Sequence, residues 1–163
     1  MNNYSDNYPE FYKKIKEKIF QYTGRIDIHH IGSTSIPGMK GKGIIDILVG
    51  YDSNKNSKKL ATQLKKAGFI FQKSSSKDRI FLSNKIEETK EGDFHIHLTR
   101  KNSLEYVNLL KFKKILLKFP KSCEEYLFAK QISEKSAQGK RKLYKENKSV
   151  VIEKILRDYS KLK

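Results

Sequence analysis

The segment from His30 to Asp46 carries the residue types best suited to chemistry. It reads His-Ile-Gly-Ser-Thr-Ser-Ile-Pro-Gly-Met-Lys-Gly-Lys-Gly-Ile-Ile-Asp, a turn rich in glycine and serine followed by an apolar stretch that bears a carboxylate. Gly32 lets backbone amides approach a phosphate without an intervening Cβ, and Ser33 and Ser35 add hydroxyl donors. Asp46 is suited to a hard divalent cation. The glycines do not have the spacing Gly-x-x-x-x-Gly-Lys-Ser/Thr, which excludes that class of phosphate loop.

Two interpretations of this segment stay open from residue types alone. Taken alone, such a turn is more often an ordinary loop with a capping serine than an active site. Asp46 lies in the apolar run Ile-Ile-Asp-Ile-Leu-Val, where burying an unpaired carboxylate costs on the order of several kcal/mol. It therefore needs a metal ion or an ion pair, for example with Lys40 or Lys42.

Hydrophobic periodicity and breakers predict the elements that position these residues. Strand-like segments are expected at 26–31, 44–49, 69–72, 79–83 and 94–99, and helices at 9–22, 58–67, 104–119, 123–136 and 141–159, with breaks at Pro120 and Gly139. In the last strand, strict alternation places His95 and His97 on one face, and Ile96 and Leu98 on the other. His29 and His30 likewise point to opposite faces. Without a repeat, linker or shift in composition, we expect one domain over residues 1–163.

The composition is typical of a small intracellular domain. Hydrophobic residues make up only 37% of the 163 residues, but nine Phe and nine Tyr supply large buried areas. The single cysteine, Cys123, cannot form an internal disulfide, which predicts a reducing cytoplasm. The polar first ten residues are neither a secretory signal nor a transit peptide, and no apolar run is long enough to span a membrane.

The formal net charge of +17 predicts attraction to phosphates, nucleotides or nucleic acid. A second explanation is that lysine is abundant throughout the chain, as expected for a genome biased towards A and T. Solvated lysine faces are common on soluble proteins.

The motifs, in their order along the chain, resemble those of the GrpB family. They comprise the family's Gly-Ser-Thr signature and Ile-Asp-Ile strand, its Arg-aromatic strand, its His-Leu-His-Val strand, a helix that ends in proline, and the Tyr, Lys and Ile pattern of the last helix. The matching segments, which span about three-quarters of the chain, are His30–Gly38, Lys42–Ile47, Arg79–Phe81, His95–Leu98, Phe112–Pro120 and Tyr144–Ile152. One departure is Phe112-Lys113-Lys114, where the family usually has Phe-Arg-Asp.

The resemblance implies an α+β, nucleotidyltransferase-like fold, a mixed β-sheet flanked by helices with a C-terminal helical segment. It also implies a site for a divalent metal (Mg or Mn, with Zn as a further option) and a nucleoside triphosphate. Active transferases of that superfamily usually carry two carboxylates two residues apart on one strand and a third on a neighbouring strand. Here the second position is Leu48, so a two-metal site is incomplete.

The family pattern assigns expected roles to individual residues. His95 and His97 lie where the third carboxylate is expected, so with Asp46 they are candidate metal ligands, and His97 is favoured; imidazole prefers Mn or Zn to Mg. A purely structural histidine pair is the alternative. Asp93 is a further candidate, which a turn-capping role also explains. The expected catalytic set is Asp46, His97 and His30, and the expected phosphate or substrate contacts are Gly32, Ser33, Ser35, Lys42, Arg79, Tyr144 and Lys148.

The leading hypothesis is a metal-dependent nucleotidyltransferase with an unknown acceptor. The first alternative is a module that binds a nucleotide or another phosphorylated small molecule but has lost transfer chemistry, as Leu48 suggests. The second is a basic RNA-binding accessory protein, which uses the charge but lacks a recognisable stacking motif.

Overall fold

The computed structural model describes residues 1–74, 76–84, 93–138 and 141–161. The chain divides into two compact units, residues 1–109 and residues 110–163. Helix α3 (Leu104–Lys118) begins in the first unit and continues into the second. Within the described residues, no helix is long and apolar enough to cross a membrane.

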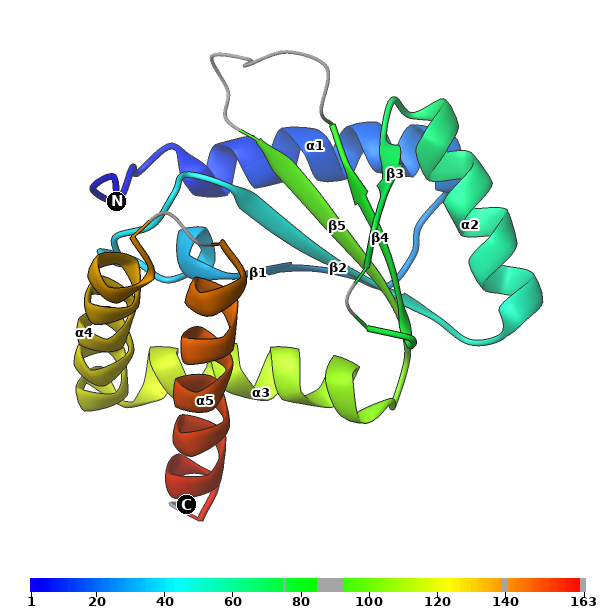
Figure 1. Ribbon diagram of the computed structural model, residues 1–163. Coiled ribbons are helices and arrows are strands. Elements are labelled where there is room, and N and C mark those ends of the chain that lie inside the picture. Colours follow the sequence, from blue (N-terminus) through cyan, green and yellow to red (C-terminus); the bar gives the residue numbers. More distant parts are fainter. Residues whose placement is uncertain (75, 85–92, 139–140, 162–163) are drawn as a thin grey trace. The chain divides into compact units, whose positions relative to one another are not determined.

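The first unit is built on a five-stranded mixed sheet with the strand order β1-β2-β5-β4-β3. Strands β2 and β5 are parallel, and the other neighbouring pairs are antiparallel. A short 3₁₀ helix at Ser33–Ser35 lies in the segment that connects β1 to β2. The elements, shown in Figure 1, are α1 (Tyr8–Thr23), β1 (Ile28–Ile31), β2 (Ile45–Tyr51), α2 (Asn54–Lys66), β3 (Ile70–Gln72), β4 (Arg79–Ser83) and β5 (Phe94–Arg100). The predicted α+β class with a mixed sheet flanked by helices is confirmed.

The core of this unit lies between one face of the sheet and helices α1 and α2. Alternate residues of β2 and β5 point to it, because side chains of a strand alternate between the two faces. The helices bury one apolar stripe each against the same face. The most deeply buried residues of this core include Ile19, Ile45, Ile47, Val49, Leu64, Leu82, Ile96 and Leu98. The opposite face of the sheet is therefore the one that carries polar groups.

Two predicted boundaries are wrong for identifiable reasons. Helix α2 begins at Asn54 rather than at Lys58, because the Ser53 hydroxyl caps it by accepting a hydrogen bond from the Asn56 amide at 3.2 Å. The predicted break at Pro120 is present, since α3 ends at Lys118, but α4 begins at Pro120 rather than at Cys123, because the first position of a helix needs no amide donor. The predicted break at Gly139 lies outside the described residues.

The second unit contains the rest of α3, α4 (Pro120–Ala137) and α5 (Arg141–Tyr159). Helices α4 and α5 run side by side along their length (Figure 1). They are joined by the Tyr159 hydroxyl, which donates to Glu125 at 2.9 Å, and Tyr126 of α4 packs edge-on against Phe112 of α3. The predicted C-terminal helical segment is therefore present as a small helical unit.

Candidate functional site

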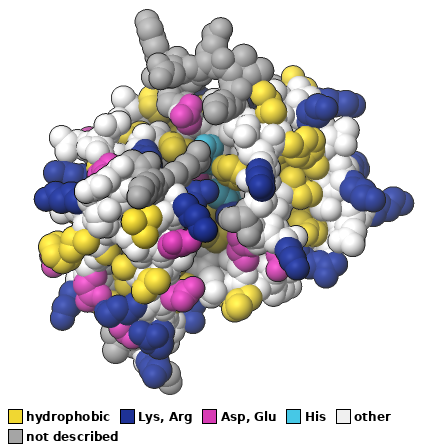
Figure 2. Space-filling view, viewed as in Figure 1, with side chains coloured by type: hydrophobic (Ala, Val, Ile, Leu, Met, Phe, Trp, Pro, Cys, Tyr) yellow, Lys and Arg dark blue, Asp and Glu magenta, His cyan; other side chains and the backbone are white. Residues whose placement is uncertain are grey.

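Asp46 and two histidines lie together on the polar face of the sheet. The parallel register of β2 and β5 pairs Asp46 with His95 and Leu48 with His97. Paired residues of neighbouring strands point to the same face, so the alternation predicted for β5 places both imidazoles on the side of the carboxylate. Figure 2 shows that histidine side chains reach the surface on one face of the molecule, next to basic side chains.

Among the described residues, the Asp46 carboxylate interacts with two imidazoles and with no lysine. Its Oδ1 lies 3.0 Å from His97 Nε2 and 3.6 Å from His95 Nδ1, and the carboxylate is 26% exposed. Burial raises the pKa of Asp46, but the two imidazoles beside the carboxylate, His95 at 3.6 Å and the hydrogen-bonded His97, outweigh this and hold the pKa well below its ordinary value. Asp46 is therefore ionised at neutral pH, and pairing with Lys40 or Lys42 does not account for it.

A guanidinium on the next strand orients His97. Arg79 Nη1 lies 3.0 Å from His97 Nδ1 and 3.3 Å from Glu105 Oε1. Since a guanidinium can only donate, His97 Nδ1 accepts, and the ring proton lies on Nε2, which donates to Asp46. Both nitrogens of His97 are engaged, so this imidazole is held in one tautomer and one orientation.

The Gly-Ser turn packs directly on the carboxylate. Gly32 has φ +74° and ψ −175°, a conformation that essentially only glycine adopts. A Cβ at Gly32 would lie 2.4 Å from Asp46 Oδ2. Ser35 Oγ donates to the Gly32 carbonyl at 2.7 Å, which closes the turn, and Ser33 is half-buried. Glycine is required here for close approach as well as for backbone freedom.

His30 does not join Asp46, because it points to the other face of the sheet. It pairs with Ile47 across β1 and β2, whereas Ile31 pairs with Asp46. Its Nε2 lies 2.9 Å from Thr34 Oγ1, and its ring stacks on Tyr12 with centroids 4.7 Å apart. The Thr34 hydroxyl donates in turn to the Ile44 carbonyl at 3.0 Å. His30 thus contacts the turn through Thr34, on the face of the sheet opposite to Asp46.

The other predicted site residues come from different segments of the chain. Lys42 is exposed in the segment before β2, and Asp93 is exposed and uses its backbone carbonyl to accept from the Ile45 amide at 2.7 Å. Tyr144 and Lys148 lie on α5, in the second unit.

Sequence reasoning did not identify Glu105 or a second polar cluster on the same face of the sheet. In that cluster the Tyr106 hydroxyl donates to Asp27 Oδ2 at 2.6 Å, and Asp27 Oδ1 lies 2.9 Å from His29 Nε2. Burial, the hydrogen bond to Asp27 and the negative charge of Asp27 raise the pKa of the Tyr106 hydroxyl. Gly50 leaves room for the cluster, since a Cβ there would lie 2.2 Å from Asp27 Oδ2. The two-residue spacing of Asp27 and His29 is the signal that was available.

The family model for the GrpB protein matches residues 1–158. This chain belongs to the GrpB family. Among curated relatives, the UPF0157 protein BH1888 of Halalkalibacterium halodurans is 21% identical over 156 residues, which cover 94% of this chain and 78% of that protein. The family match spans both compact units.

Solved structures extend the comparison. The crystal structure of the conserved protein GrpB from Enterococcus faecalis superimposes with a TM-score of 0.76 and 20% identity, covering 98% of this chain and 99% of that one. A structure of the Cid1 poly(U) polymerase with MgGTP bound matches less well, with a TM-score of 0.49 and 16% identity over 80% of this chain and 46% of that one. The first match shows that the GrpB fold is shared, and the second does not determine what this chain binds.

The low pKa of Asp46 predicts how acid affects stability. Because the pKa is lower in the folded state than in the unfolded state, ionised Asp46 stabilises the fold above its ordinary pKa of 3.8, and this contribution is lost as the pH falls further. We expect Asp46→Asn to lower the free energy of unfolding at pH 6, with the difference from the parent shrinking below about pH 4. Urea unfolding across this range measures it. A difference that is constant with pH would contradict the assignment.

Proposed function

We propose that the chain binds a nucleoside triphosphate with its phosphates at the turn of residues 32–35 and transfers the nucleotidyl group to an acceptor hydroxyl. The observation that carries the proposal is the packing of this turn on Asp46 beside His95 and His97. The Ser33 hydroxyl and backbone amides of this turn are the donors for phosphate oxygens, because the Ser35 and Thr34 hydroxyls donate to the Gly32 and Ile44 carbonyls. We expect the reaction in the cytoplasm, as the lone cysteine predicts.

The charge of Asp46 determines how a phosphate can reach the turn. An ionised carboxylate repels a phosphate a few ångströms away, so a cation must lie between them. One carboxylate and two imidazoles are donors that suit Mn or Zn better than Mg. In the part of the chain that the structure describes, however, no three His, Cys, Asp or Glu side chains are arranged to hold an ion. The residues do not fit a resident metal, and we propose that the cation arrives with the nucleotide.

Transfer requires a group that accepts the proton of the acceptor hydroxyl. The acceptor oxygen bonds to the α-phosphorus, the bond from that phosphorus to the bridging oxygen breaks, and pyrophosphate leaves. His97 is engaged at both nitrogens, whereas His95 Nδ1 lies beyond hydrogen-bond distance from Asp46, at 3.6 Å. We therefore assign proton acceptance to His95, and the positioning of Asp46 to His97 and Arg79.

A second candidate function is nucleotide binding without transfer. Leu48 is fully buried on the face that carries Asp46, at the position where active transferases of the resembled superfamily usually carry a second carboxylate. An apolar side chain there cannot help to place the ions of a two-metal mechanism. The nucleotide would then act as a regulator or a stabilising ligand.

His95→Gln separates the two candidates. With triphosphates labelled in the α-phosphate, we expect the parent to transfer label and release pyrophosphate, and the variant to be slower by about 100-fold or more. The affinity for the nucleotide, measured by calorimetry, should change by less than about threefold, since His95 has no hydrogen bond to the carboxylate. Binding without transfer by the parent supports the second candidate. Absence of binding to any nucleotide would overturn both.

A further inference from the structure

The positive charge of the chain is concentrated in the second unit. Residues 110–163 hold 16 of the 35 Lys and Arg residues but only six of the 18 Asp and Glu residues. Acidic residues occur equally often in both units. Basic residues make up nearly one residue in three of the second unit and about one in six of the first. A lysine bias acting on the whole chain would raise the fraction of basic residues in both units alike. The excess in the second unit therefore needs its own explanation.

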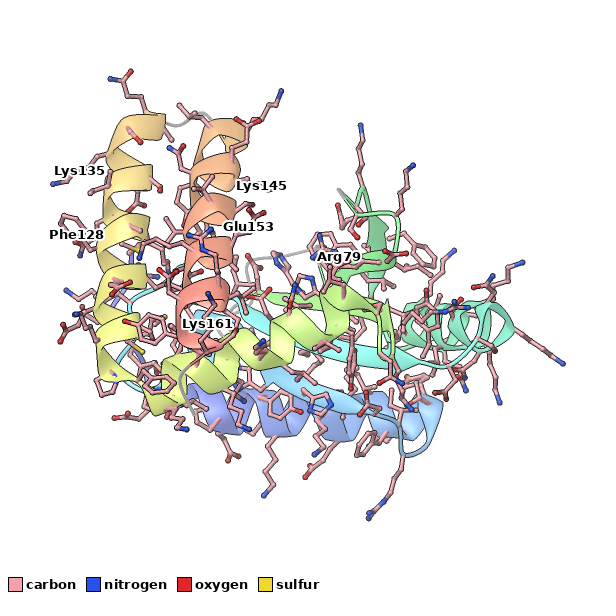
Figure 3. All side chains as sticks on the ribbon, turned by 90° about the horizontal axis from the view of Figure 1, so that it is seen from below. Arg79, Phe128, Lys135, Lys145, Glu153 and Lys161 are labelled. Carbon is pink, nitrogen blue, oxygen red and sulfur yellow. The ribbon has the colours of Figure 1, made fainter. Side chains whose placement is uncertain are left out.

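One stripe of α4 combines this charge with an exposed aromatic ring. Lys121, Phe128 and Lys135 follow each other at seven-residue spacing, which is close to two helical turns, so they share one face. Figure 3 shows Phe128 and Lys135 on the side of α4 that points away from α5. Phe128 is 64% exposed, and both lysines are exposed. We call Lys121, Phe128, Ile132 and Lys135 the α4 stripe.

The lysines of the α4 stripe are available to a ligand. Neither Lys121 nor Lys135 takes part in an ion pair within the described residues. Glu125, which is four residues from Lys121, is instead turned towards α5, where it accepts from Tyr159 and lies 3.4 Å from Lys154 Nζ. Glu124 is the exposed acidic neighbour of the stripe.

We infer that the α4 stripe binds single-stranded nucleic acid. The two lysines are separated by about 21 Å along the helix, a length over which one strand at B-form spacing carries about six phosphates. An aromatic ring between cationic groups is the arrangement on which an unpaired base stacks. The inference stands on the second unit alone and does not depend on nucleotide binding at Asp46.

A lipid surface fits this unit less well. A helix that lies on a membrane has one strongly apolar face and one charged face. The α4 stripe instead mixes lysines with Phe128 and Ile132, and α5 exposes Val150 among charged residues. Apolar and charged side chains are therefore interspersed, as suits a ligand that offers both bases and phosphates.

Fluorescence anisotropy with a labelled oligo(dT) or oligo(U) of about 12 nucleotides tests the inference. We expect Phe128→Ala to weaken binding about tenfold. The matched control is Phe71→Ala, which removes a ring that is 48% exposed on β3 of the first unit and should leave binding within about twofold. Glu124→Gln should strengthen binding, because it removes a negative charge beside the stripe.

Two double charge-reversal variants distinguish a localised binding site from attraction by the overall positive charge of the chain. Lys121→Glu with Lys135→Glu should weaken binding more than tenfold and reduce the slope of log affinity against log salt by about 1.4. Lys55→Glu with Lys59→Glu makes the same change in net charge on exposed residues of α2. Equal losses in the two double variants would overturn the inference. So would a parent that binds anionic vesicles but no oligonucleotide.

Discussion

Replacing Asp46 with asparagine is expected to make nucleotide binding independent of divalent cations. The parent should bind a nucleoside triphosphate at least about tenfold more tightly with manganese than with a chelator, because the ion offsets the repulsion between the carboxylate and the phosphates. Asp46→Asn removes that repulsion and retains an oxygen that accepts from His97. The variant should therefore bind better than the parent in chelator, and gain less than about twofold from manganese.

Titration calorimetry of both proteins with and without manganese measures this difference. The matched control is Asp52→Asn, which removes the same charge from a side chain that is 71% exposed and paired with Lys101. Asp52→Asn should behave as the parent does, because solvent and salt screen an exposed charge. A variant at Asp46 that keeps the full cation dependence would show that the phosphates bind elsewhere.

Gly32→Ala is expected to destabilise the fold more than the same substitution at a glycine of equal conformation. Gly32 and Gly24 have nearly the same backbone angles, φ +74° with ψ −175° and φ +72° with ψ −171°. Backbone strain should therefore lower the free energy of unfolding by about 1–3 kcal/mol at both positions. At Gly32 the new methyl group also meets the Asp46 carboxylate, whereas at Gly24 nothing lies within 4 Å.

The steric contact should add about 1–3 kcal/mol to the loss at Gly32. Urea unfolding of the two variants measures the difference, since the strain common to both positions cancels. Gly32→Ala should also abolish nucleotide binding, whereas Gly24→Ala should retain it at temperatures where it stays folded. Equal destabilisation by the two substitutions would mean that the turn is not packed against the Asp46 carboxylate.

Local patterns were sufficient to predict most of the elements. The alternation of residues 94–99 correctly indicated that His95 and His97 share a face, because side-chain direction in a strand depends only on sequence spacing. The apolar run around Asp46 correctly indicated a buried strand with a carboxylate that needs partners. The turn chemistry of residues 32–38 was also visible, since Gly32 has the positive φ that glycine favours.

Pairing register, which joins residues distant in sequence, could not be predicted in this way. The contact between Asp46 and His97 spans 51 residues and depends on the parallel pairing of β2 with β5. The same register decides that Ile31 lies beside Asp46, and therefore that His30 points to the opposite face. The motif alone favoured His30 because it adjoins the turn in sequence.

Helix α3 supplies the group that no local pattern revealed. Glu105 lies in the first turn of this helix, where an acidic residue is ordinarily explained by the helix dipole. Its ion pair with Arg79 holds the guanidinium that orients His97. Only the ion pair between the start of this helix and β4 shows that Glu105 belongs to the site.

The proposal that nucleotide phosphates lie beside Asp46 is tested most directly by paramagnetic broadening of the protein's NMR signals. A manganese complex of a non-hydrolysable nucleoside triphosphate should broaden the amide signals of residues 32–35 and the imidazole signals of His95 and His97, and the magnesium complex should shift the same signals without broadening them. Two results would contradict the proposal. The manganese complex could broaden signals of other residues, or it could leave the signals of residues 32–35, His95 and His97 sharp.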